Sequence, residues 1–60
     1  MTIEEEKEVR HLIDVIEYKI AEVKNDFNQG KIRNLSEKSR FVKVPAEMLY
    51  NLLEKIDSSN

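Results

Sequence analysis

The apolar residues in the first half of the chain recur at helical spacing. Between positions 9 and 27 they follow one another at intervals of three and four residues, with one adjacent pair, which is the period of an α-helix. At 100° per residue they form a stripe about 100° wide along one side of the helix. This stripe consists of Val9, Leu12, Ile13, Ile16, Ile20, Val23 and Phe27. The pattern predicts an amphipathic helix over residues 3–28.

Both ends of this predicted helix carry capping signals. Thr2 is followed three residues later by Glu5, the pair that satisfies free backbone N–H groups at a helix start. The chain reaches its only glycine at Gly30, where a left-handed conformation closes a helix C-terminus. These signals support the predicted bounds.

A second apolar stripe follows the only proline. Pro45 suits the first position of a helix, where its missing N–H costs nothing. The stripe after it consists of Met48, Leu49, Leu52, Leu53 and Ile56. The pattern predicts a helix over residues 45–57, and the polar residues 58–60 are expected to form a frayed tail.

The segment 31–44 between the two stripes is basic and less regular. Asn34 followed by Glu37 predicts one helical turn. Residues 41–44 are rich in β-branched side chains and precede the proline, which favours a short extended stretch. The expected fold is an all-α helical hairpin, comprising a single domain over residues 1–60.

The two predicted helices differ in length. At 1.5 Å per residue the first spans about 39 Å and the second about 20 Å. The second helix therefore covers about half of the first stripe. We expect a second copy of the chain to cover the rest, giving a two-fold dimer with a four-helix core, and a different protein would serve the same purpose. Lys19 and Lys24 flank the stripe and would repel their copies in a parallel pair, so antiparallel packing is expected.

The composition offers few groups for catalysis. The chain has 60 residues, no cysteine and one histidine. Glu8 and His11 have the Glu-x-x-His spacing of di-metal bundles, but both are expected to face away from the stripe. We therefore expect no enzymatic activity, no metal, no cofactor and no small-molecule substrate.

The N-terminus is acidic where an export signal would be basic, and the longest apolar run is only Met48–Tyr50. The acidic polar face of the first helix disfavours anionic lipid surfaces. We expect a cytoplasmic protein without a membrane partner.

The middle of the chain supports an alternative function. Five basic residues gather there, with Phe41 among them, and could neutralise phosphates while the aromatic ring stacks on a base. These residues are Lys31, Arg33, Lys38, Arg40 and Lys43. The alternative is a nucleic-acid-binding transcriptional regulator that uses residues 31–43.

Residues 40–56 add a local resemblance. The sequence Arg-Phe-Val-Lys-Val-Pro followed by an amphipathic helix resembles the strand and first helix of ribbon-helix-helix repressors. The resemblance covers under a third of the chain, and the family's second helix has no counterpart after it. It implies that Ser39, Phe41 and Lys43 would lie on a strand and read the major groove.

Three further apolar or aromatic residues are expected to face away from the core. They are Val15, Tyr18 and Tyr50. Aromatic side chains at such positions can anchor a protein partner. The favoured interpretation is a small protein–protein interaction module that acts as a homodimer, in the role of a regulator, inhibitor or assembly adaptor.

Overall fold

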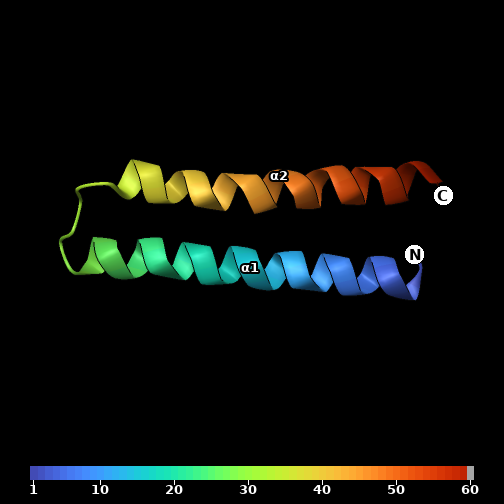
Figure 1. The fold of residues 1–60 in the computed structure, drawn as a ribbon, viewed down its shortest axis with the longest axis horizontal. Coiled ribbons are helices and arrows are strands. Elements are labelled where there is room, and N and C mark those ends of the chain that lie inside the picture. Colours follow the sequence, from blue (N-terminus) through green and yellow to red (C-terminus); the bar gives the residue numbers. More distant parts are fainter. Residues whose placement is uncertain (60) are drawn as a thin grey trace.

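The chain folds as two antiparallel helices of nearly equal length (Figure 1). The computed structural model describes residues 1–59. Helix α1 spans Ile3–Asn28 and helix α2 spans Leu35–Ser59, so both chain ends lie at the same end of the hairpin. The molecule measures 45 × 16 × 11 Å. The predicted all-α hairpin is confirmed, and residues 1–59 contain no strand.

Helix α1 has the predicted bounds and the predicted start. The Thr2 hydroxyl accepts the backbone N–H of Glu5 at 3.1 Å, and the Glu5 carboxylate accepts the backbone N–H of Thr2 at 2.9 Å. This second bond stabilises the ionised carboxylate and lowers the pKa of Glu5 from its usual value. The reciprocal pair accounts for the helix beginning where the sequence indicates.

The turn between the helices uses two residues with left-handed backbone. Gly30 has φ of 77°, and its N–H donates to the Phe27 carbonyl at 3.0 Å. Asn34 has φ of 70°, a conformation that asparagine adopts more readily than most residues. Its carbonyl accepts the N–H of Lys38 at 3.0 Å and so starts α2.

Helix α2 begins ten residues earlier than the sequence pattern indicates. The turn expected at Asn34 is its first turn, but the extended stretch expected over residues 41–44 is wrong because these residues are helical. Pro45 lies inside the helix and is buried. Packing along α1 outweighs the local preference for an extended chain before proline. Residues 58 and 59, expected in a frayed tail, belong to α2, and residue 60 lies outside the described residues.

Two interpretations change with this longer helix. The expected length mismatch is wrong, since α1 has 26 residues and α2 has 25. The likeness to ribbon-helix-helix repressors is also lost, because Ser39, Phe41 and Lys43 lie within a helix and provide no strand to pair across a dimer.

The contact between the helices buries little. Leu12 and Ile56 are the large apolar side chains that it buries among residues 1–59. The accessible surface is 5,082 Å², against about 4,100 Å² for a compact protein of 7.1 kDa. The hairpin therefore exposes about 1,000 Å² more surface than its mass requires.

Replacing the interior proline is expected to stabilise the fold. In Pro45→Ala the new N–H can donate to the Phe41 carbonyl, which removes a helix penalty of about 3 kcal/mol. Loss of the buried ring carbons removes about 1.5 kcal/mol of stabilisation by apolar burial. The net gain of about 1 kcal/mol or slightly more raises the midpoint of thermal unfolding, followed by circular dichroism. Ala46→Pro is the matched control and should lower the midpoint. A lower midpoint for Pro45→Ala would mean that the ring contributes more by packing than it costs the backbone.

Candidate interaction surfaces

Helix α2 covers one side of the predicted stripe and leaves the other side in water. Leu12 is buried, and Val9, Ile16 and Val23 are half-buried. The remaining three stripe residues, Ile13, Ile20 and Phe27, are 40%, 50% and 62% exposed. They stand seven residues apart, so they lie in one row along α1. The stripe is correct as an apolar face, but its own chain covers only part of it.

This row continues onto the second helix. Helical geometry places Val42, Leu49 and Leu53 on the side of α2 that lies next to this row. All three are half-buried. We call these six residues the edge face, comprising Ile13, Ile20 and Phe27 of α1 with Val42, Leu49 and Leu53 of α2. The hollow beside Ile13 is also lined by the charged side chains of Glu6, Arg10 and Asp14, so charged residues border the edge face at this end.

A groove of about 420 Å³ lies between the helices on their other flank. Val15, which lines it, is about 160° around α1 from Ile13 of the edge face. The apolar lining consists of Leu12, Val15, Phe41, Val44, Pro45 and Met48. Its polar lining consists of Glu8, His11 and Lys19. The hairpin thus has apolar surface on both flanks.

Lys19 lies at one end of this groove beside two aromatic rings. Its Nζ is 5.9 Å from the centre of the Phe41 ring and 6.0 Å from that of Tyr18. These distances are at the outer limit of a cation–π attraction. The side chain of Lys19 is half-buried, so its ammonium group is held next to the apolar lining.

The residues proposed for partner binding have different environments. Tyr18 and Tyr50 are about two-thirds exposed, as expected. Val15 is half-buried in the groove, so the expectation that it faces away from the core is wrong. Sequence reasoning missed Phe41, Val44 and Met48 as one surface, because it predicts a short extended stretch over residues 41–44. Their spacing of three and four residues across Pro45 was the available signal.

Glu8 and His11 lie on the wall of the groove next to Leu12, not on a face directed away from the apolar residues. Residues 1–59 contain no cluster of three or more side chains suited to hold a metal ion. Within the same residues, neither helix is apolar enough over a sufficient length to cross a membrane.

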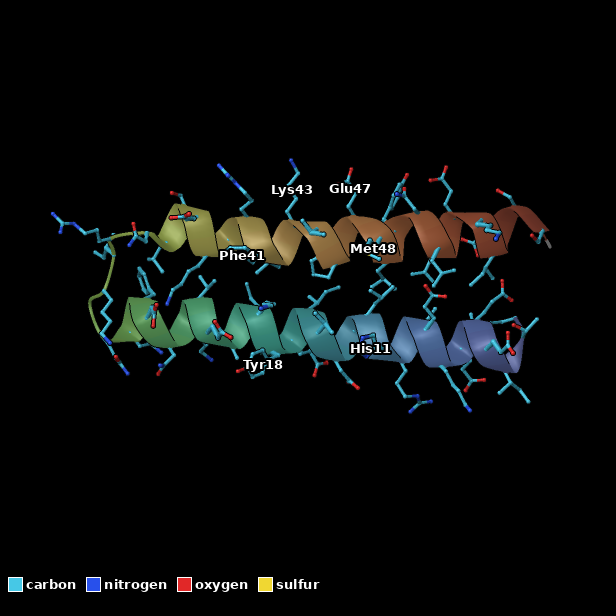
Figure 2. The ribbon with its side chains drawn as sticks, viewed as in Figure 1. His11, Tyr18, Phe41, Lys43, Glu47 and Met48 are labelled. Atoms are coloured by element: carbon cyan, nitrogen blue, oxygen red, sulfur yellow. The ribbon has the colours of Figure 1, made fainter. Side chains whose placement is uncertain are left out.

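The five central basic residues are divided among three places. Lys31 and Arg33 lie in the turn, whereas Arg40 and Lys43 are on α2 and exposed. Lys43 points away from α1, as does Glu47 one turn later (Figure 2). Lys38 instead faces α1, where its ammonium group donates to the Asp26 carboxylate. One of the five cations is thus paired within the chain.

The ion pair between the helices gives a pH dependence. Bonding to Asp26 raises the pKa of Lys38. The ion pair therefore stabilises the fold completely at pH values below 10.5, the usual pKa of lysine. This effect is lost as the pH rises through the higher pKa of the folded state. The free-energy difference between the wild-type chain and Lys38→Met, measured by urea unfolding, should therefore shrink in alkaline buffer. Lys43→Met is the control, and the same alkaline trend in both variants would contradict the assignment.

Comparison of the chain with family models, with curated proteins and with solved structures found no match. The functional argument therefore depends on the two apolar flanks described above.

Proposed function

We propose that the chain is a protein–protein interaction module that acts as a homodimer, with the edge face as its dimer interface. The observation that carries this proposal is the exposed row of Ile13, Ile20 and Phe27. Three large apolar side chains in one row are costly to leave in water and are typical of an association surface.

The amount of exposed surface supports a second copy as the occupant. A stable interface buries about 800 Å² on each partner. The excess of about 1,000 Å² over a compact protein of the same mass is sufficient for this. Two hairpins packed through their edge faces form a four-helix bundle, in which each stripe is covered on both sides.

An antiparallel arrangement fits the sequence of the edge face. When two α1 helices cross near Ile16, Ile13 of one copy lies opposite Ile20 of the other, because both are three to four residues from the crossing point. The apolar pair Ile13 and Ile20 then meets twice, once on each side of the crossing point, and Phe27 lies opposite position 6 of the other copy. The flank with the groove stays open for another protein, which is the basis of a role as regulator, inhibitor or assembly adaptor.

Disulfide trapping tests this arrangement, since the chain has no native cysteine. We expect an oxidised mixture of Ile13→Cys and Ile20→Cys chains to form the mixed disulfide in preference to either like pair, because only the mixed pair is brought opposite. Proteolytic digestion followed by mass spectrometry without reducing agent identifies which two cysteine-containing peptides are linked.

Tyr18→Cys is the control for random collision, because its side chain is exposed but lies outside the edge face. Equal yields of all disulfides, including those of the Tyr18→Cys chain, would contradict the antiparallel dimer.

A further inference from the structure

The groove remains accessible when the edge face is covered, and its lining has a defined chemical pattern. Phe41, Val44 and Met48 are each more than half exposed in it. We propose that the groove binds an amphipathic helix of a partner protein, with an acidic side chain at the Lys19 end and a basic side chain at the Glu8 end. The inference rests on the proposed function and specifies the partner's chemistry.

The spacing of the two charged groups sets the length of this helix. Glu8 and Lys19 are eleven residues apart, which is about 16 Å along α1 and about three full turns. They therefore lie on the same side of α1, at opposite ends of the apolar lining. A partner helix of about three turns spans the same distance and brings its own charges opposite both groups.

Both charges are free to pair with a partner. The ion pairs in the described part of the chain, residues 1–59, join Arg10 to Glu6 and Lys38 to Asp26. Neither Glu8 nor Lys19 takes part in them. Lys19 already lies beside the Phe41 ring, so a carboxylate that approaches it becomes partly shielded from water, which strengthens the attraction.

A helix fits this groove better than a compact apolar molecule does. A third helix laid between two antiparallel helices contacts both of them along its length. A small molecule can cover Val44 and Met48, but it is too short to pair with two charges about 16 Å apart.

The charges also define the direction of the partner helix. Acidic residues are favoured in the first turn of a helix and basic residues in the last turn. With its acid at Lys19 and its base at Glu8, the partner helix runs from the turn towards the chain ends, in the same direction as α2. A reversed helix would carry its charges against its own dipole.

Two designed peptides test the proposal. Each is a helix-stabilised peptide of about four turns with leucines on one face. One carries glutamate in its first turn and lysine eleven positions later, and the other has glutamine at both positions. We expect the wild-type chain to bind the first peptide about tenfold more tightly than the second, in fluorescence anisotropy at low salt. The double variant Glu8→Gln with Lys19→Gln should bind the two peptides with about equal affinity.

Three results would contradict the proposal. Equal affinities for the two peptides would remove the role of Glu8 and Lys19, and no binding of either peptide at about 1 mM would remove the helix site. If single Glu8→Lys and Lys19→Glu chains associate with each other more tightly than with themselves, the groove is occupied by a second copy. The oligomeric state of the wild-type chain is measured in the same buffer. A monomer that still discriminates between the peptides would uphold the groove and overturn the dimer.

Discussion

Ile20→Asp is expected to weaken the dimer by about a hundredfold or more. Ile20 is half exposed in the hairpin and lies in the middle of the edge-face row. In the dimer it becomes buried in both copies, so the substitution removes apolar burial twice and places two carboxylates in an apolar interface. A loss of about 3 kcal/mol per dimer corresponds to about a hundredfold in the dissociation constant.

Tyr18→Asp is the matched control for this change. It introduces the same side chain two residues away, about 160° around α1, at a position that is exposed and outside the edge face. The intrinsic cost of aspartate within the helix is then the same in both variants. Concentration-dependent size-exclusion chromatography with light scattering should give a dimer for Tyr18→Asp and a monomer for Ile20→Asp. Equal dissociation of both variants would point to a general loss of helix stability.

Leu12→Ala is expected to remove a large part of the folding free energy. Leu12 is 6% exposed and is the most buried residue of α1. Leucine-to-alanine changes in a core cost about 2–5 kcal/mol, and the lower half of this range applies to a narrow two-helix contact that can close over the gap. Since 60 residues fold with a total of roughly 3–9 kcal/mol, the variant should be close to unfolding at room temperature.

His11→Ala is the matched control for Leu12→Ala. His11 is exposed on the wall of the groove, so its truncation should change stability by less than about 0.5 kcal/mol. Urea unfolding at one fixed protein concentration measures both variants, because association contributes to the apparent stability. Similar midpoints for the two variants would show that Leu12 is not at the centre of the contact between the helices.

The first helix follows from its sequence because each of its features is local. The Thr2–Glu5 pair, the periodic apolar residues and Gly30 all act within a few residues of their own positions. The structure places α1 from Ile3 to Asn28 and gives Gly30 the left-handed conformation, as predicted. No partner element is needed to set these boundaries.

The start of the second helix does not follow from its sequence, because local and long-range preferences disagree there. Pro45 and the β-branched residues before it favour an extended chain. In the hairpin, Val42 and Pro45 bury surface against α1, and Lys38 pairs with Asp26, so ten further residues become helical. These gains depend on contacts with a segment 12 or more residues away, which periodicity alone does not report.

The edge face and the groove show the same limit of prediction from sequence periodicity. The apolar stripe predicts an association surface that includes Ile13, Ile20 and Phe27, but it does not show which side of the stripe α2 covers. Because α2 packs towards the Leu12 side, the groove forms from Val15 together with residues 41–48, a combination that no single helix pattern contains. The two helices do not differ in length, so the case for association depends on the exposure of Ile13, Ile20 and Phe27 in the hairpin.

Sedimentation equilibrium of the wild-type chain between about 1 and 100 μM tests the dimer directly. We expect a mass twice that of the 7.1 kDa chain over most of this range, with dissociation only at the lowest concentrations. A folded species of 7.1 kDa at every concentration, with a thermal midpoint independent of concentration, would contradict the account.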